Sequence, residues 1–256
     1  ICIIGAGYTG LSSALHLAKR GYKVIVLEAE TVAFGASGRN GGHVGIGQRA
    51  DQAELEDKLG HERASVLWDM GLEAVDTVKS LIAEHNIDCD LKHGDMHLAH
   101  KRRLCGEFQE EVAFLADRYN FTDMEYIPSA RLSEVVGSDG FYGGVWDKAS
   151  CHLHPLNYAL GLVDAAVQAG VTIYEYSRVI SYGGSPLAIK TINGQVTACE
   201  LILACNGYIE KLEPKINGYI MPINNFVLAT EPFSDELARS IIPKDTSMAD
   251  SRFVIN

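Results

Sequence analysis

The sequence predicts an α/β protein, because apolar strands and amphipathic helices alternate at its start and an apolar strand returns late in the chain. Residues 1–28 read as a strand, a glycine-rich turn, a helix and a second strand that ends in an acid. A further helix is expected at HLHPLNYALGLVDAAVQAG, where Pro155 suits the first turn and Gly170 the end. ELILACNGY, residues 200–208, reads as a fully buried strand that returns to the same sheet. Together these segments predict a Rossmann-like domain.

The turn GAGYTG, residues 5–10, has the spacing of a dinucleotide-binding motif. In such a turn Gly5 permits the tight bend, Gly7 lets the backbone approach a pyrophosphate, and Gly10 lets the helix pack closely on the sheet. The helix then directs its free N–H groups and positive dipole end at the phosphates. A glycine turn without a ligand is the alternative. Strand, turn, helix, strand and acid nevertheless occur in the order that nucleotide binding requires, and we favour that interpretation.

The identity of the nucleotide depends on three segments. Glu28 ends the second strand, where a carboxylate can accept both hydroxyls of an adenosine ribose and would repel a 2′-phosphate, which disfavours NADP. The glycine turn alone leaves NAD and FAD open. The loop GASGRNGG, Gly35 to Gly42, follows the second strand directly, and the late strand ends in the small polar pair Asn206-Gly207. Both positions suit an extended FAD molecule better than NAD.

The composition of the chain excludes several classes of function. The chain has 256 residues, 47% of them hydrophobic, and a formal net charge of −11, which is unfavourable for binding a nucleic-acid backbone. We find neither an apolar run of membrane-spanning length nor a signal leader, and we expect a cytoplasmic protein. Six scattered cysteines without a CxxC pair favour reduced thiols over disulfides or a metal site. The chain opens inside a strand without an initiator Met and closes at strand-like SRFVIN, so we expect a fragment of a longer protein.

The order of the remaining patterns predicts two interleaved domains, with 1–90 and 150–212 in the nucleotide domain and 91–149 and 213–256 in the other. The expected elements outside the first unit are a helix at 61–85, two short strands about Gly94, a helix at 107–119, a hairpin joined by Asn193-Gly194, strand-like residues 220–233 and a helix capped by Ser234.

The motifs GAGYTGLSSALHLAKRG, LEA, GASGRNGG, HLHPLN and ACNGY together resemble the glycine oxidase and D-amino-acid oxidase superfamily of flavoenzymes. Within it they are most similar to the gamma-glutamylputrescine oxidoreductase group. The resemblance implies a Rossmann-like FAD-binding domain interleaved with a smaller, incomplete α+β substrate domain that contains an antiparallel sheet.

The resemblance also implies a set of FAD-binding residues. They are Gly5, Gly7, Tyr8, Thr9 and Gly10 at the pyrophosphate; Glu28 at the adenosine ribose, with Ala29 of the LEA motif; Ser37, Gly38, Arg39, Asn40, Gly41 and Gly42 toward the flavin ring; Val179 at the adenine; and Cys205, Asn206 and Gly207 over the phosphates.

Several polar residues are functional candidates. The fork of Arg39 suits phosphate oxygens, although a surface arginine is the alternative. For His43 a role in lining the flavin or substrate site and a plain loop histidine are equally favoured, because the relatives often carry glutamine there. His93, His97 and His100 do not share one strand face, so we expect surface histidines and no metal site. No catalytic residue can be assigned.

The resemblance further implies a reaction. The expected activity is oxidation of a carbon–nitrogen single bond of a small amine or amino acid, such as a gamma-glutamylputrescine-like substrate. Water would hydrolyse the imine, and oxygen would be the acceptor and yield hydrogen peroxide. An NAD-dependent dehydrogenase and a nucleotide-binding module without turnover are the alternatives. The sequence does not predict the oligomeric state.

Overall fold

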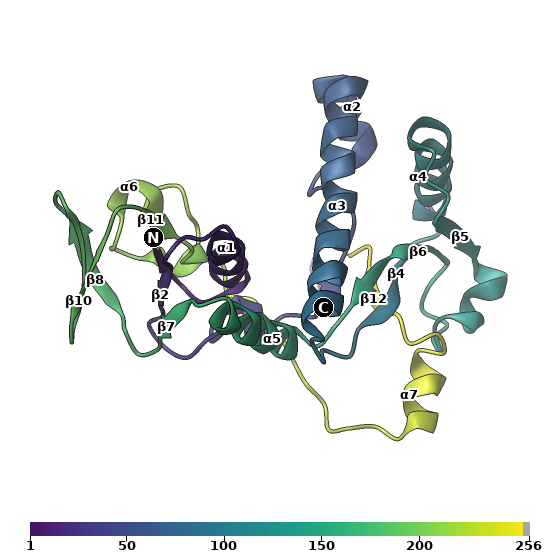
Figure 1. The fold of residues 1–256 in the computed structure, drawn as a ribbon. Helices are drawn as coiled ribbons and strands as arrows, with labels where there is room; N and C mark the ends of the chain where they lie inside the picture. Colours follow the sequence, from purple (N-terminus) through teal and green to yellow (C-terminus); the bar gives the residue numbers. More distant parts are fainter. Residues whose placement is uncertain (253–256) are drawn as a thin grey trace. The chain divides into compact units, whose positions relative to one another are not determined.

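The computed structural model describes residues 1–252, and the chain forms two compact units (Figure 1). The first unit comprises 1–41, 82–89 and 154–228, and the second comprises 42–81, 90–153 and 229–256. The last four residues of the strand-like segment SRFVIN lie outside the described residues. No helix in the described part of the chain is both long and apolar enough to cross a membrane.

A four-stranded parallel sheet forms the centre of the first unit, as the sequence predicts. Its order is β11-β1-β2-β7, with bounds Leu201–Leu203, Cys2–Ile4, Ile25–Leu27 and Thr172–Tyr174. The β11 residues are only half-buried rather than fully buried, because β11 is the edge strand of this sheet. The short strands end at the same level, which brings the turns that follow them together.

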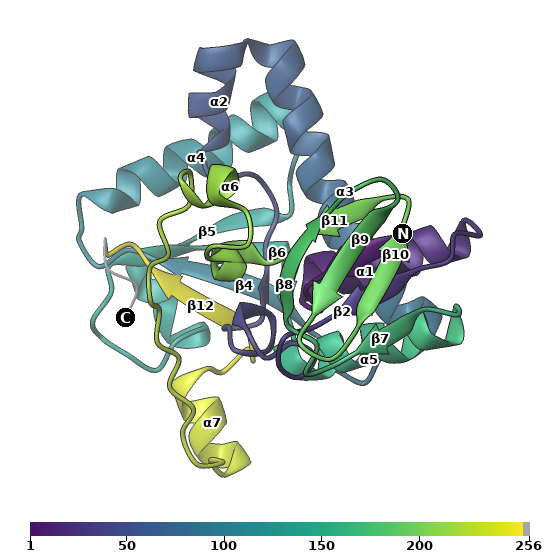
Figure 2. The same cartoon turned by 90° about the vertical axis from the view of Figure 1, so that its left-hand side faces the viewer.

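Two helices and a second sheet cover the parallel sheet. Helices α1 (Tyr8–Lys19) and α5 (Pro155–Gln168) pack against each other, and Leu11, Leu15 and Leu162 are completely buried there. Strands β8 (Val179–Gly183), β9 (Leu187–Thr191) and β10 (Gln195–Ala198) form the antiparallel sheet on the opposite side (Figures 1 and 2). The predicted Asn193-Gly194 hairpin is confirmed, since it joins the antiparallel pair β9 and β10.

The segment after β11 departs from the prediction. It contains a 3-10 helix, η3 (Asn206–Ile209), and a short helix, α6 (Pro214–Asn217). The strand-like prediction for residues 220–233 is wrong: this stretch has no regular structure, and the side chain of Phe226 is 87% exposed. An apolar segment with high β-propensity forms a strand only where the edge of another strand is available for pairing. No described strand pairs with residues 220–233.

A mixed, mostly antiparallel sheet forms the centre of the second unit. Its order is β12-β4-β6-β3, and β5 also pairs with β6. The strands are β3 (His43–Val44), β4 (Lys92–Leu98), β5 (Met124–Pro128), β6 (Gly143–His152) and β12 (Ser247–Asp250). The helices are α2 (Gln52–Leu59), α3 (His61–His85), α4 (Leu104–Tyr119) and α7 (Asp235–Ile241). The helix expected at 61–85 is confirmed, and Ser234 caps α7 by accepting the Leu237 N–H.

Strand β4 is one strand rather than the two short strands predicted about Gly94. A β-bulge between His93 and Asp95 absorbs the glycine, whose φ is +95°. A Cβ at Gly94 would lie 2.7 Å from Trp146 Nε1. The position therefore requires glycine for its lack of a side chain as well as for its positive φ. A bulge bends a strand without ending its pairing, which the local sequence pattern does not distinguish from a turn.

The compact units also differ from the expected domain boundaries. Residues 42–81, expected in the nucleotide domain, belong to the second unit, whereas 213–228 belong to the first. The first difference arises because β3 pairs with β6 and because Trp68 of α3 packs on Leu115 and Phe121. These contacts join residues far apart in sequence.

Candidate functional site

A cavity of about 550 Å³ opens in the first unit beyond the carboxyl ends of β1, β2 and β11. The start of α1, the loop at 33–37, and the segments 178–180, 203–206 and 208–212 complete its wall. In open parallel sheets ligands bind in such crevices, and this volume lies within the range of small-molecule sites. All of the residues that line it belong to the first unit.

The glycine turn after β1 forms the floor of the cavity. Gly5 has φ +107°, and a Cβ there would lie 2.5 Å from the carbonyl oxygen of Ala204, which follows β11. A Cβ on Gly10 would lie 1.9 Å from the carbonyl oxygen of Gly5. Both approaches are to backbone atoms that cannot rotate away, so both positions require glycine.

The amino end of α1 faces the same cavity. Gly7 is the N-cap residue and has no side chain with which to cap the helix. Tyr8 and Thr9 line the cavity, which therefore receives the positive end of the helix dipole. Ser37 Oγ accepts the Tyr8 N–H at 3.0 Å. The phenol of Tyr8 points elsewhere, donating to the Pro155 carbonyl at 2.9 Å.

The Glu28 carboxylate is held in place by backbone donors. Its Oε2 accepts the N–H of Ala6 at 2.7 Å and its Oε1 accepts the N–H of Glu30 at 3.0 Å. Each carboxylate oxygen keeps a further lone-pair position for another donor. Because Glu28 and Ala29 line the cavity, this geometry can accept the two hydroxyls of a ribose.

Three residues from the later segments reach the same cavity. Val179, at the start of β8, is buried and lines it, as do Cys205 and Asn206 after β11. Cys205 Sγ contacts the Ile4 carbonyl oxygen at 3.5 Å, and burial raises the pKa of this thiol. Asn206 adopts φ +50°, which turns the chain away from the sheet into η3.

The rest of the glycine-rich loop has other contacts. Ser37 lines the cavity from the 3-10 helix η1 (Ala36–Gly38), and Asn40 Nδ2 donates to the carbonyls of Ala36 and Ser37, each at 3.0 Å. The Arg39 guanidinium lies over the Phe34 ring, 4.3 Å from its centroid. Arg39 is not among the residues that line the cavity.

The predicted glycines Gly10, Gly38, Gly41, Gly42 and Gly207 do not line the cavity either. A Cβ on Gly38 would lie 2.4 Å from the Ala33 carbonyl oxygen. Gly42 has φ +73° and belongs to the second unit, where a Cβ would lie 1.9 Å from the Leu153 carbonyl oxygen. Close backbone packing accounts for both residues, and their role in cofactor binding stays a prediction.

The sequence analysis missed several residues that line the cavity, among them Arg178, Glu30 and Tyr208. Arg178 and Glu30 form an ion pair at 3.0 Å, and Tyr208 lies so close to Gly35 that a Cβ there would be 3.0 Å from its ring. Tyr208 is the last residue of the ACNGY motif, so this motif could have indicated that Tyr208 lies at the cavity. The ion pair joins residues 148 positions apart and has no local signature.

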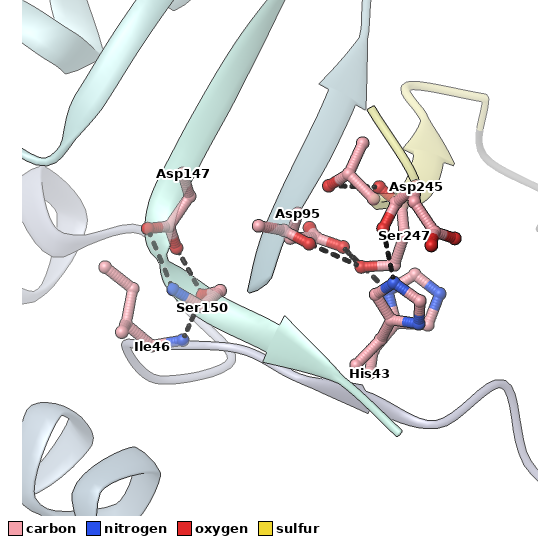
Figure 3. A network of polar contacts seen from close by, with 10 residues as sticks. His43, Ile46, Asp95, Asp147, Ser150, Asp245 and Ser247 are labelled. Carbon is pink, nitrogen blue, oxygen red and sulfur yellow. Dashed lines mark hydrogen bonds and ion pairs between the residues drawn. The ribbon is translucent and has the colours of Figure 1, made fainter. Parts of the chain in front are cut away.

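The second unit contains a separate polar network on its sheet (Figure 3). His43 Nδ1 lies 2.8 Å from Asp95 Oδ1, and Ser247 Oγ donates to the same oxygen. Asp147, opposite Asp95 on β6, accepts from the hydroxyl and the N–H of Ser150. The hydrogen bond that His43 donates to Asp95 raises the pKa of His43, and burial raises the pKa of Asp147.

The other histidines on β4 and beyond it lie apart from this network. His93 is exposed, the His97 ring lies 5.0 Å from the Phe108 ring, and His100 Nδ1 contacts Ser251 Oγ at 2.8 Å. Among residues 1–252 no group of three or more His, Cys, Asp or Glu side chains is placed to hold a metal ion.

The glycine turn, the helix start at Gly7 and the Glu28 carboxylate held by backbone N–H groups define the first unit as a dinucleotide-binding fold. The whole chain, residues 1–256, matches the family described as FAD dependent oxidoreductase, and the chain belongs to that family. FAD is accordingly its cofactor.

Curated relatives and solved structures agree with this membership. The chain is 39% identical over 263 residues to a probable oxidoreductase, OrdL, of Haemophilus influenzae, and 36% identical over 258 residues to the gamma-glutamylputrescine oxidoreductase of Escherichia coli. These alignments include 100% of the chain but only 61% and 60% of the relatives' lengths. The crystal structure of glycine oxidase from Geobacillus kaustophilus has the same fold over 84% of this chain and 57% of its own, with a TM-score of 0.67 and 20% identity.

Proposed function

We propose that the cavity of the first unit holds the adenosine and pyrophosphate part of FAD. The ribose hydroxyls would bind Glu28, and the pyrophosphate would lie against the helix start at Gly7 and Thr9. The adenine would contact the backbone at Val179. The chemistry of these groups fits: a carboxylate accepts two hydroxyls, and N–H groups at a helix start bind a diphosphate without a cation.

We further propose that the full-length protein oxidises a carbon–nitrogen single bond of an amine or amino acid. The observation that carries this proposal is the family match over residues 1–256, combined with a cavity lined by the glycine turn and by Glu28. When bound, FAD supplies a two-electron acceptor for the carbon beside the amine nitrogen, and the protein supplies binding and orientation. Similarity to the gamma-glutamylputrescine oxidoreductase of Escherichia coli supports gamma-glutamylputrescine as the first substrate to test. The proposal includes oxygen as the acceptor and hydrogen peroxide as the product.

The visible spectrum of the purified full-length protein tests this proposal. We expect a yellow protein whose flavin absorption bleaches when gamma-glutamylputrescine is added without oxygen, and which forms peroxide when oxygen is admitted. A colourless protein that binds NAD would support a dehydrogenase instead. A yellow protein that no amine or amino acid bleaches would support a binding module without turnover.

Substitution of Glu28 is expected to weaken FAD binding. In Glu28→Gln one acceptor oxygen is replaced by an amide donor, so either Ala6 N–H or Glu30 N–H and one ribose hydroxyl lose their acceptor. Loss of a charge-assisted hydrogen bond costs about 2 kcal/mol, which corresponds to a dissociation constant about 30-fold higher.

Titration of the apoprotein with FAD, followed by flavin fluorescence, measures this effect. Glu84→Gln is the matched control, since Glu84 is an exposed carboxylate that pairs with Lys19. Equal FAD affinity in Glu28→Gln and Glu84→Gln would contradict the placement of the ribose.

A further inference from the structure

An ion pair lies in the wall of the cavity of the first unit, on the segments that flank Glu28. Arg178 Nη2 lies 3.0 Å from Glu30 Oε1, and both residues line the cavity. Arg178 comes directly before β8, and Glu30 follows the end of β2. Their side chains are 50% and 41% exposed, so both charges lie at the surface of the wall and neither is part of the core.

Backbone hydrogen bonds fix both members of the pair beside Glu28. The N–H of Glu30 donates to the Glu28 carboxylate at 3.0 Å, and the N–H of Ser177, the residue before Arg178, donates to the Glu28 carbonyl at 2.7 Å. The N–H of Tyr176 donates to the Glu30 carbonyl at 2.9 Å. The two segments therefore meet at Glu28 through main-chain contacts that do not depend on the ion pair.

The charged residues that line the cavity are three acids and two bases. They are Glu28, Glu30, Glu210, Arg178 and Lys211. Glu210 and Lys211 belong to the segment after β11, whereas Arg178 is joined through Ser177 to the main chain of Glu28. Arg178 is thus the cation that lies next to the carboxylate at which we place the ribose.

Glu28 and Arg178 have opposite preferences for the ribose. A carboxylate at the end of the second strand of a dinucleotide-binding fold accepts the ribose hydroxyls, whereas a nearby arginine accommodates a 2′-phosphate. The cavity wall contains both kinds of residue. A guanidinium that already pairs with a carboxylate offers fewer free donors and less net charge to a phosphate. The Glu30 carboxylate therefore cancels the feature that would otherwise attract a 2′-phosphate.

We propose that Glu30 is a specificity-determining residue of the cavity, because it pairs with Arg178 and so withholds the guanidinium group from a 2′-phosphate. This inference rests on the proposed placement of the ribose at Glu28. Glu28 selects the free hydroxyls by accepting them, and Glu30 selects against a phosphate on the same ribose by neutralising the neighbouring cation. Together the two acids favour FAD, whose adenosine ribose carries no 2′-phosphate.

The binding of two ligands that differ only in the 2′-phosphate tests this proposal. ADP-ribose and 2′-phospho-ADP-ribose are each titrated calorimetrically into the full-length apoprotein at low ionic strength. We expect the wild type to bind 2′-phospho-ADP-ribose about 100-fold more weakly, because Glu28 loses a hydroxyl donor and repels the phosphate. Glu30→Gln keeps the shape of the side chain and the backbone contacts of residue 30. It should reduce this ratio about 10-fold, because Arg178 can then form a charge-assisted hydrogen bond to the phosphate.

Two further variants assign the effect to Arg178. When Arg178→Gln is added to Glu30→Gln, the unpaired cation is lost, and the ratio should return to within about 2-fold of the wild-type value. Glu210→Gln is the matched control, because it removes one negative charge from the same cavity wall and keeps the pair of Arg178 with Glu30. It should change the ratio by less than about 2-fold, since the added phosphate gains no new donor.

Three outcomes would overturn the inference. They are an unchanged ratio in Glu30→Gln, a reduced ratio that persists when Arg178 is also replaced, and an equal reduction in Glu210→Gln. Failure of the proposed ribose placement is distinguishable, since Glu28→Gln would then bind ADP-ribose as tightly as the wild type. The circular dichroism spectrum of each apoprotein verifies the fold, and the binding measurements do not depend on turnover.

Discussion

Gly10→Ala is expected to lower the free energy of unfolding by about 3 to 4 kcal/mol and to abolish FAD retention. The new Cβ would lie 1.9 Å from the Gly5 carbonyl oxygen, so the start of α1 and the end of β1 must separate. Overpacking a buried site typically costs about 1 to 3 kcal/mol, and more where a rigid backbone atom is the obstacle. Urea denaturation of the apoprotein, followed by circular dichroism, measures the loss.

Gly106→Ala is the matched control for that experiment. Gly106 lies in α4 with nothing within 4 Å of the added Cβ, so alanine should stabilise the helix by about 0.5 to 1 kcal/mol. Opposite signs for the two glycine-to-alanine changes are the expected result. If Gly10→Ala were as stable as the wild type, the tight approach of α1 to Gly5 would be contradicted.

Gly7→Ala is expected to leave the fold largely intact and to weaken FAD binding about 1,000-fold. Gly7 has φ −86°, which alanine adopts readily, and the nearest atom to a new Cβ is Ser37 Oγ at 2.8 Å. That hydroxyl can rotate, at the cost of its hydrogen bond to the Tyr8 N–H. The added methyl group would then occupy part of the cavity in which we place the pyrophosphate. Losing two charge-assisted hydrogen bonds corresponds to about 4 kcal/mol.

Calorimetric titration of the Gly7→Ala apoprotein with FAD measures this effect, and urea denaturation of the same preparation verifies the fold. Ser37→Ala serves as its control, because it removes the Tyr8 acceptor without adding an atom to the cavity. We expect Ser37→Ala to bind FAD far more tightly than Gly7→Ala. Unchanged FAD affinity in Gly7→Ala would count against placing the pyrophosphate at this turn.

The sequence predicts well the features that local chemistry determines. The strand, turn and helix at residues 2–19 have a hydrophobic period and glycines that few other conformations satisfy. Pro155 at the start of α5 and the Asn193-Gly194 hairpin are similarly local. The family membership also follows from short motifs, and the comparison over residues 1–256 confirms it.

Features that depend on distant partners could not be predicted. Strand β12 pairs in parallel with β4, about 150 residues earlier, and residues 42–81 join the second unit through β3 and α3. Conversely, residues 220–233 have strand-forming composition without a strand to pair with among the described residues. Composition reports what a segment can form, whereas the available sheet edges decide what it does form.

The same division applies to the two polar sites. Glu28 could be predicted, because its position at the end of the second strand follows from the motif. The carboxylate partner of His43 could not, since residues 43, 95 and 247 meet only through the pairing of strands that are far apart in the sequence. Arg39 shows the opposite case. Its guanidinium group suits phosphate oxygens, but in the structure the side chain stacks on the Phe34 ring.

A crystal structure of the yellow full-length protein tests the central claim most directly. The account predicts adenosine density with both ribose hydroxyls within hydrogen-bond distance of Glu28, and diphosphate density against the backbone of Gly7 and Thr9. Val179 should meet the adenine from β8. A flavin bound away from these residues, or a different ligand in this cavity, would contradict it.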